Sequence, residues 1–327
     1  KAGAKRRNLY LFLFIIFYFL VSFLLFSIKG LWMDSFLPIC SSFYIFLSIT
    51  IHRYSRERML RKEEEKKELA GKLKNETFIN THLTDSNIEI VVRTSPTHEV
   101  EGDFFDIIRI EDNQIGVLLG RAPGRGLDTV NYIIKLVNEF RLQAPLYRKP
   151  RVLLNAVNNV LFAEGTKGMY ATCLYILVDT NKMTINFANA GHDPLIIASE
   201  NKQEMSVYEA LDSTPLGIAK NVGFLDQEVP INKGDLIVGF TAGVVEAKNR
   251  EGKEFGLDNL KEVINQYRTW NLTKLGNKIF EKIYRFSQGQ KNHQECSVLL
   301  IKVKEELVKD KETVYERRKI SAQQMVK

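Results

Sequence analysis

The chain has 327 residues, with 46 Lys and Arg against 39 Asp and Glu, for a net charge of +7. Much of the positive charge flanks apolar runs near the N-terminus, and no basic stripe with interleaved aromatic residues follows, which argues against nucleic-acid binding. The three cysteines are spaced neither for a zinc site nor for a disulfide framework.

Residues 1–52 are predicted to form a transmembrane region with two spans, 9–28 and 31–51. The first run is uncharged and long enough to cross the hydrocarbon core as a helix, and the second is broken only by Asp34 and Pro38. Basic residues on both flanks place both ends in the cytoplasm. We therefore expect a multi-pass protein of the bacterial inner membrane, with the lipid bilayer as a partner and the folded domain in the cytoplasm. A signal peptide is disfavoured by the second span. The spans are alternatively the last two of three, with sequence upstream of Lys1.

Residues 53–84 are predicted to be a charged linker helix. The segment 53–76 has no proline and has Glu–Lys and Glu–Arg pairs four residues apart, such as Glu68 and Lys72, an order that stabilises helices. Its apolar residues do not repeat as heptads. A solvated spacer and a signal-transmitting coil that forms a homodimer both remain open.

Residues 85–303 are predicted to form one α+β domain, and 304–327 a charged C-terminal tail that is a solvated helix or a disordered end. The hydrophobic pattern predicts hairpins of strands followed by pairs of helices. This order favours a layered sandwich over a doubly wound parallel sheet. The expected strands are 87–95, 104–110, 114–120, 170–179, 184–188, 195–199, 206–210, 236–241 and 297–303, and the expected helices are 127–142, 150–163, 257–267 and 273–286.

Seven short motifs in this domain occur in a recognisable order. They are Val100–Asp106 (VEGDFFD), Gly120–Gly126, Ala188–Pro194 (ANAGHDP), Pro215–Gly217, Gly234–Asp235, Thr241–Ala247 (TAGVVEA) and Glu254–Gly256. In this order the domain resembles the SpoIIE/RsbU-type branch of the PPM metal-dependent Ser/Thr protein phosphatases, whose motifs read VGGDFYD, GDVSG, ANAGH, PLG and TDG. The resemblance implies a PPM-phosphatase-like β-sandwich flanked by helices.

The resemblance also implies two divalent ions, Mg²⁺ or Mn²⁺, held by four aspartate positions. Asp103 retains the first position, and Asp106 is a weaker candidate ligand. Arg121, Ala242 and Gln294 occupy the other three. A guanidinium has no acceptor and cannot lose its charge. At an effective dielectric constant of 20, a positive unit charge 4 Å from the guanidinium is repelled by about 4 kcal/mol. A divalent cation at the same distance is repelled by about twice as much. We therefore expect no cofactor, with Mg²⁺ or Mn²⁺ only if an active enzyme uses altered ligands.

Two arrangements of Arg121 are open: it pairs with Asp103 in place of the metals, or it points to solvent from its turn. The glycines of the motifs are expected to set backbone geometry, and His192 to fix a strand end and turn rather than to act as a base. Glu295 is expected at the surface, and Cys296 as a packed thiol. The frame residues of the motifs are Gly102, Gly120, Gly124, Gly126, Gly191, His192 and Gly243.

These features predict a membrane-anchored cytoplasmic signalling protein with a degenerate phosphatase domain, a pseudophosphatase that binds or sequesters a protein or phosphoprotein. The resemblance suggests a STAS-type anti-sigma antagonist as that partner, and no nucleic acid is expected. An active divalent-metal phosphatase with altered ligands is one alternative, and a structural component of a membrane assembly is another.

Overall fold

A computed structural model describes residues 16–17, 20, 23–24, 27, 33–78, 81–95, 100–163, 168–200, 205–211, 214–288 and 294–304, without the side chains of 33–40. Most of the first predicted span and nearly all of the predicted tail lie outside these residues. The chain divides into two compact units, Lys1–Lys66 and Lys67–Lys327, and the division falls within one helix.

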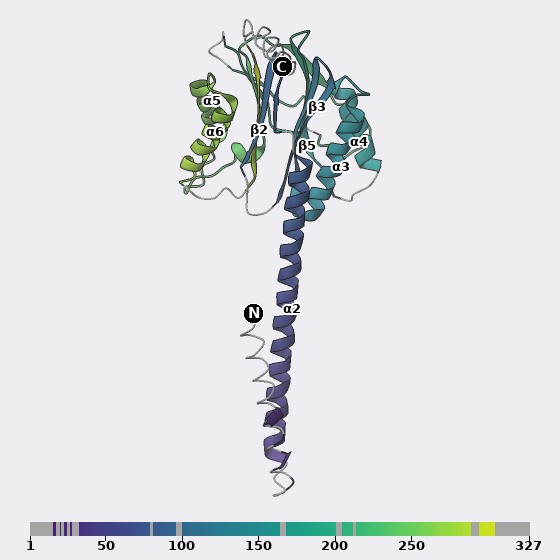
Figure 1. Ribbon diagram of the computed structural model, residues 1–327, viewed down its shortest axis with the longest axis vertical. Helices are drawn as coiled ribbons and strands as arrows, with labels where there is room; N and C mark the ends of the chain where they lie inside the picture. The colour runs from purple at the N-terminus through teal and green to yellow at the C-terminus, as the bar shows by residue number, and fades with distance from the viewer. Residues whose placement is uncertain are drawn as a thin grey trace, which may run out of the picture. The chain divides into compact units, whose positions relative to one another are not determined.

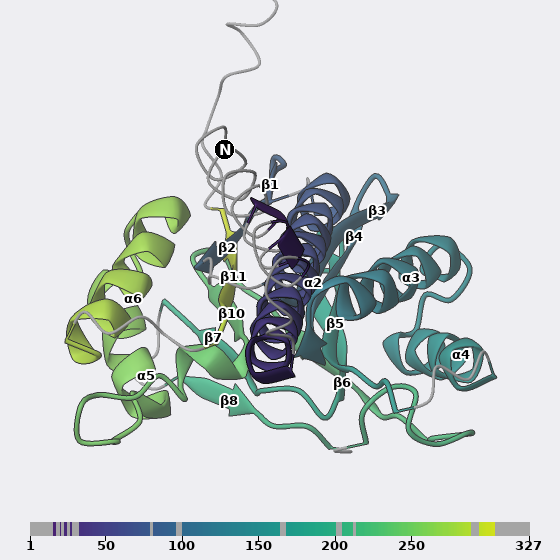
Figure 2. The same cartoon turned by 90° about the horizontal axis from the view of Figure 1, so that it is seen from below.

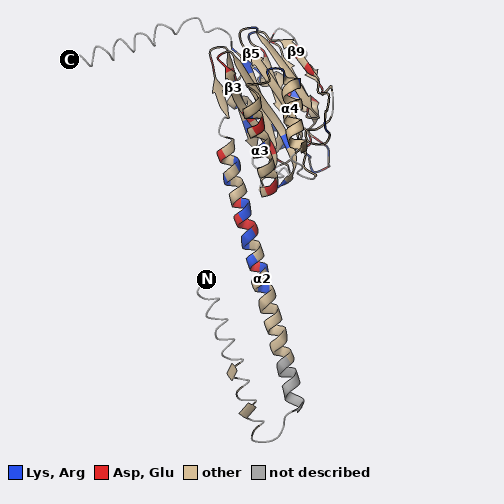
Figure 3. Ribbon diagram, turned by 90° about the vertical axis from the view of Figure 1, so that its right-hand side faces the viewer, with Lys and Arg blue, Asp and Glu red and all other residues tan. Residues whose placement is uncertain are grey.

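That helix, α2, runs unbroken from Met33 to Thr77. It contains residues 53–77 of the predicted linker and continues backwards through the second predicted span, whereas residues 82–84, also predicted as linker, form a strand. Within the described residues, no helix is both long and apolar enough to cross a membrane. The described residues do not show the predicted two-span hairpin, and this finding contradicts the predicted inner-membrane localisation. The helix as a whole is not an apolar segment, because from Arg53 onward it carries acidic and basic residues at nearly every turn, as Figure 3 shows.

The second unit contains two antiparallel sheets, which confirms the α+β prediction. One has six strands and the other five. In spatial order, the six-stranded sheet is β1 (His82–Thr84), β2 (Ile88–Ser95), β11 (Cys296–Val303), β10 (Leu236–Phe240), β7 (Leu195–Ala198) and β8 (Ser206–Tyr208). The five-stranded sheet is β3 (Glu101–Glu111), β4 (Gln114–Arg125), β5 (Thr172–Asp179), β6 (Thr184–Ala190) and β9 (Asp226–Pro230).

A pair of helices lies beside each sheet (Figure 1 and Figure 2). Helices α3 (Leu127–Gln143) and α4 (Pro150–Ala163) lie beside the five-stranded sheet, and α5 (Gly256–Tyr267) and α6 (Leu272–Phe286) lie beside the other. A single 3-10 turn, η1 (Ala242–Val244), follows β10. Each sheet has two faces, and an apolar face must be covered by a second layer. The helix pairs cover the outer face of each sheet.

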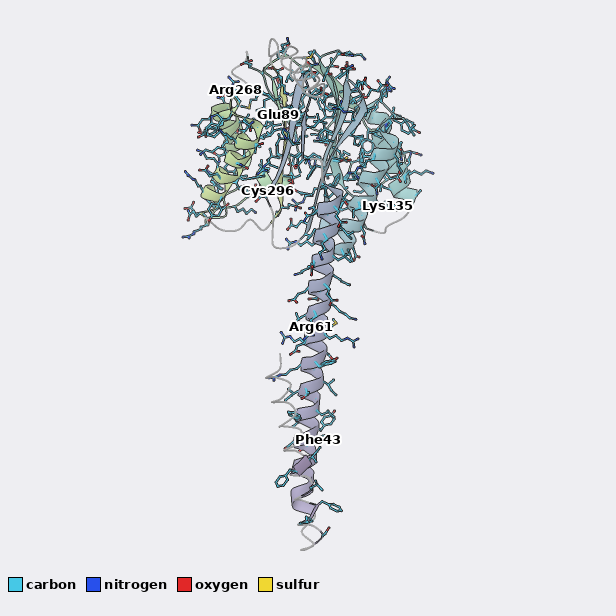
Figure 4. All side chains as sticks on the ribbon, in the orientation of Figure 1. Phe43, Arg61, Glu89, Lys135, Arg268 and Cys296 are labelled. Carbon is cyan, nitrogen blue, oxygen red and sulfur yellow. The ribbon has the colours of Figure 1, made fainter. Side chains whose placement is uncertain are left out.

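The core follows the two-residue alternation of the strands. On β2, Ile88, Ile90 and Val92 join the large cluster that includes residues of both sheets, of α3 and of α4. Val91 points the other way, into the cluster between the six-stranded sheet and helices α5 and α6. Cys296, labelled in Figure 4, belongs to this second cluster and is 1% exposed, so the predicted packed thiol is confirmed.

Two edge strands, β1 and β9, escaped prediction. β1 has three residues, and β9 reads Asp-Gln-Glu-Val-Pro with no position fully buried. Edge strands are often short or charged because these features discourage pairing with other chains, and the same features remove the apolar alternation by which a strand is predicted.

A charge-compensated candidate site

Asp103 lies at the centre of the candidate site, on β3, and is 1% exposed. Its Oδ2 accepts hydrogen bonds from two hydroxyls, Thr241 Oγ1 at 2.7 Å and Ser297 Oγ at 2.8 Å. Burial raises the pKa of the Asp103 carboxyl, while Arg121 and the two hydroxyl donors partly oppose that rise. Oδ2 of Asp103, the retained ligand position, therefore already accepts two hydrogen bonds from the protein itself.

Arg121 forms an ion pair with the other oxygen, Oδ1, which has no hydrogen-bond partner among the described residues. Asp103 and Arg121 are direct neighbours in the β3–β4 register, and Arg121 Nη1 lies 3.4 Å from Asp103 Oδ1. The same nitrogen donates to the Glu295 carbonyl at 3.3 Å, while Nη2 donates to Glu101 Oε2 at 3.3 Å. With its side chain 23% exposed, Arg121 does not point freely to solvent. Of the two arrangements left open by the sequence, the ion pair with Asp103 is the one present, and Arg121 bridges two carboxylates rather than forming a fork with one.

Glu101 and Glu295 complete the anionic side of the site, and neither was predicted there. Glu101 is 2% exposed; its Oε2 accepts from the Glu295 backbone N–H at 2.7 Å, and its Oε1 lies 3.2 Å from Arg125 Nη2. Glu295 is 7% exposed, so the expectation of a surface carboxylate was wrong. Its position between β11 and the Glu101 side chain removes it from water.

Lys74, in the last turn of α2, supplies a further cation. Its Nζ lies 2.6 Å from Glu295 Oε2 and donates to the Glu101 carbonyl at 2.9 Å. Burial raises the pKa of Glu295 to about 7; the charge of Lys74 lowers it and the charge of Asp103 raises it. Sequence gave no signal for this contact, because Lys74 and Glu295 are separated by 221 positions.

With all three carboxyl groups ionised, the site is balanced in charge. Three carboxylates meet three cations from the same chain: Glu101, Asp103 and Glu295 against Lys74, Arg121 and Arg125. Among the described residues, no group of three or more His, Cys, Asp or Glu side chains is arranged to hold a metal ion. A pair of divalent ions does not fit these residues as they lie, since each carboxylate is bonded to a cation or a hydroxyl and a guanidinium occupies the space between two of them.

The remaining ligand positions are arranged differently. Ala242 opens η1 and lines a cavity together with Arg121. Gln294 is half-buried and directly precedes Glu295. Asp106 is bonded elsewhere, to Arg141 of α3, with distances of 2.6 Å to Nε and 3.1 Å to Nη2. Its side chain does not join Asp103, because positions three apart on a regular strand face opposite sides.

Two motif glycines allow close backbone approach. A Cβ on Gly102 would lie 1.8 Å from the carbonyl oxygen of Ala122, and a Cβ on Gly243 would lie 2.2 Å from that of Glu295. Only glycine lets these segments meet. Gly120 is similarly crowded by Phe104, and the other frame glycines, Gly124, Gly126 and Gly191, have positive φ. The predicted backbone role of these residues agrees with this geometry.

His192 is held inside the domain. Its backbone N–H donates to Asn189 Oδ1 at 2.7 Å, and its Nδ1 lies 3.2 Å from Thr172 Oγ1. Burial, followed by the charge of Arg121, lowers the pKa of His192 to about 3. The imidazole is therefore neutral at physiological pH, as suits a residue that orders the turn after β6.

The chain also matches a known protein family. The family described as Stage II sporulation protein E (SpoIIE) matches residues 111–304, more than half of the chain. The chain belongs to the SpoIIE family. Among curated proteins, Protein IcfG of Synechocystis sp. (strain ATCC 27184 / PCC 6803 / Kazusa) is 24% identical over 59% of this chain. Phosphoserine phosphatase RsbU of Bacillus subtilis (strain 168) is 20% identical over 70% of this chain. The chain spans 35% of the length of IcfG and 68% of that of RsbU.

Solved structures share the SpoIIE-type fold. The SiaA-PP2C domain of Pseudomonas aeruginosa has a TM-score of 0.62 at 12% identity, over 76% of this chain and 98% of that domain. The RsbU and RsbW domains of Rv1364c from Mycobacterium tuberculosis have a TM-score of 0.58 at 18% identity, over 68% of this chain and 62% of that one. At such identities the likeness concerns the fold, and it assigns a PP2C-like architecture of two antiparallel sheets with flanking helices.

Proposed function

We propose that this SpoIIE-family chain is a pseudophosphatase of a signalling pathway, which binds a protein partner through its phosphatase-derived surface without hydrolysing phosphate esters. The observation that carries the proposal is the position of Arg121, within 3.4 Å of both Asp103 and Glu101. A permanent cation there occupies the place in which the family resemblance expects metal-binding carboxylates.

Electrostatics opposes metal entry as long as Arg121 stays in place. At an effective dielectric constant of 20, a divalent ion 4 Å from a guanidinium is repelled by about 8 kcal/mol. Displacing Arg121 instead would leave Asp103 and Glu101 with one cation fewer in a buried setting, at a cost of several kcal/mol. Either route weakens metal affinity, and the hydrolysis chemistry of PPM phosphatases depends on the metals to activate water.

One observation favours a second candidate, an active phosphatase with altered ligands. Glu101 and Glu295 are carboxylates beside Asp103, at positions that the motif comparison did not assign to metal binding. If Arg121 and Lys74 moved away together, three carboxylates would converge on one place.

Turnover by the full chain separates the two candidates. We expect no hydrolysis of p-nitrophenyl phosphate or of a phosphoserine peptide with millimolar Mn²⁺ or Mg²⁺, beyond the rate of the Asp103→Ala variant. Isothermal titration should detect no saturable Mn²⁺ binding that depends on Asp103. Metal-dependent turnover that disappears in Asp103→Ala would overturn the pseudophosphatase proposal and establish the alternative.

The partner half of the proposal has its own test. RsbU and RsbP are named phosphoserine phosphatases, which suggests that a phosphorylatable protein is the partner of this chain too. We expect immobilised full-length chain to retain one such protein, identified by mass spectrometry and then purified, with a measurable dissociation constant in one phosphorylation state. Failure of every recovered protein to bind when purified would contradict this half.

A further inference from the structure

A cavity of about 590 Å³ opens beside the candidate site. Arg121 and Ala242 form one part of its wall, and the turn after β6 forms another. The lining residues that matter below are Arg121, Tyr170, His192, Asp193 and Glu209. The cavity is large enough to accept a side chain of another molecule.

The uncompensated charge of this cavity is negative. Arg121 is already committed to Asp103 and Glu101, so its charge is largely offset. The other charged lining residues are Asp193, which is half-buried, and Glu209, which is exposed. No salt bridge to Asp193 forms within the described part of the chain, in contrast to the three carboxylates of the neighbouring site.

An acid in this setting is costly to ionise. Burial raises the pKa of Asp193 to about 6, and the charge of Glu246 adds to the rise. Carboxylates withdrawn from water are ordinarily matched by a cation or by several donors. Arg121 attracts Asp193 and partly opposes the rise in its pKa, but it forms no ion pair with Asp193. What the cavity lacks is therefore a positively charged hydrogen-bond donor in contact with Asp193.

A second, independent feature is a buried polar atom without a partner, on a residue that lines the same cavity. His192 is 7% exposed, lines the cavity, and its Nε2 has no hydrogen-bond partner within the described residues. Because the imidazole is neutral, it does not repel a cation, and in one tautomer Nε2 is an acceptor. Tyr170 adds an aromatic ring to the wall, and aromatic faces attract ammonium and guanidinium groups.

We propose that this cavity binds an organic cation, a primary ammonium or guanidinium group, with Asp193 as its counter-ion. As the chain's proposed function is to bind a protein, the natural source is a Lys or Arg side chain of the partner. This inference rests on the proposed function for its source and gives the partner-binding surface a chemical preference. A phosphorylated side chain is disfavoured, since its charge would face Asp193 and Glu209 while Arg121 is already paired.

Ligand-observed saturation-transfer NMR on the full chain tests the proposal. The probes are n-butylguanidinium, n-butylammonium, the neutral n-butanol, phosphoserine blocked as N-acetyl-O-phosphoserine-amide so that it has no ammonium group, and the peptide acetyl-Ala-Lys-Ala-amide. At pH 8 we expect saturable binding of the two cations and the peptide, and none of butanol or phosphoserine. Asp193→Asn should weaken cation binding at least about tenfold, the effect of losing one charge-assisted hydrogen bond.

A matched variant controls for the loss of one negative charge. Asp112 is exposed and lines a separate acidic cavity at the β3–β4 turn, so Asp112→Asn should leave cation binding unchanged. Lowering the pH from 8 to 5 should weaken binding about tenfold as Asp193 takes up a proton. The charged groups facing Asp193 are Glu246, Asp103 and Arg121, with Glu209 across the cavity.

The outcomes are separable. Equal cation binding by wild type and Asp193→Asn, saturable binding of phosphoserine, or no cation binding at all would each overturn the proposal. Binding of butylammonium without the peptide would support the cation site and assign it to a small amine. Absence of cation binding beside retention of a purified partner would leave the proposed function standing, whereas metal-dependent turnover would remove that function without touching the cation measurement.

Discussion

Replacing Arg121 by alanine should destabilise the domain, because two buried carboxylates then lose a shared cation. At 3.4 Å and an effective dielectric constant of 20, each pair is worth about 5 kcal/mol of Coulomb energy before the cost of desolvating the guanidinium is subtracted. Asp103 keeps its two hydroxyl donors, Glu101 keeps Arg125, and the Arg121 side chain is 23% exposed. We therefore expect a net loss of about 3 kcal/mol, at the low end of values for broken buried pairs.

The assay is thermal unfolding of the two variants Arg121→Ala and Arg125→Ala. A loss of 3 kcal/mol corresponds to a fall in melting temperature of about 6–12 °C for a domain of this size. Arg125 is the matched control: it lies at a similar distance from Glu101, but its side chain is 53% exposed, so its loss should cost less than about 1 kcal/mol. Equal, small shifts for both arginines would refute the reasoning, since burial would then not decide the value of the pair.

Three further predictions follow from the same site. Lys74→Met should cost about 3 kcal/mol at pH 8 and clearly less at pH 5, where Glu295 is protonated, because its pKa of about 7 lies between the two; urea unfolding that gives the same loss at both pH values would contradict this. Gly243→Ala should cost about 2 kcal/mol or more, since its Cβ would overlap the Glu295 carbonyl, whereas Gly223→Ala, with no atom within 4 Å, should be nearly neutral in the same melting assay. His192 has a folded pKa of about 3, below its unfolded value, so its contribution to stability is complete above the unfolded pKa and is lost as pH falls; between pH 7 and pH 5 the loss is about 2 kcal/mol, measured as the difference from His192→Gln.

The strands and helices of the domain were predictable where their residues alternate or recur with helical spacing. The buried strand β5 and the helix pair α3 and α4 are examples: their apolar pattern is fixed by the sheet they cover. The linker helix was equally clear from its charge pairs. The second predicted span was a different case, because an apolar run is compatible with several environments and its continuation into α2 is visible only in the structure.

The sequence was sufficient to predict which metal-ligand positions lack aspartate. It was not sufficient to predict the network of side chains that surrounds Asp103 instead. Arg121 was identified from the Gly120–Gly126 motif alone, and Glu101 stood in the Val100–Asp106 motif, where the family pattern has glycine. The side chains that complete the network come from distant elements, Lys74 from α2 and Ser297 from β11. Contacts between residues so far apart in the sequence depend on how the sheets and the end of the helix pack. They cannot be predicted from the local sequence pattern.

The equality of positive and negative charge around Asp103 constrains how this protein can change over time. Replacing Arg121 by aspartate would change the net charge of these side chains from zero to −2, which a single divalent ion would neutralise. The Lys74 ammonium would still pair with Glu295. A lineage could regain ion binding only if several positions shifted in concert, and each intermediate would carry unmatched interior charge. Strong epistasis among Lys74, Glu101, Arg121 and Glu295 is the expected signature in variant libraries of this domain.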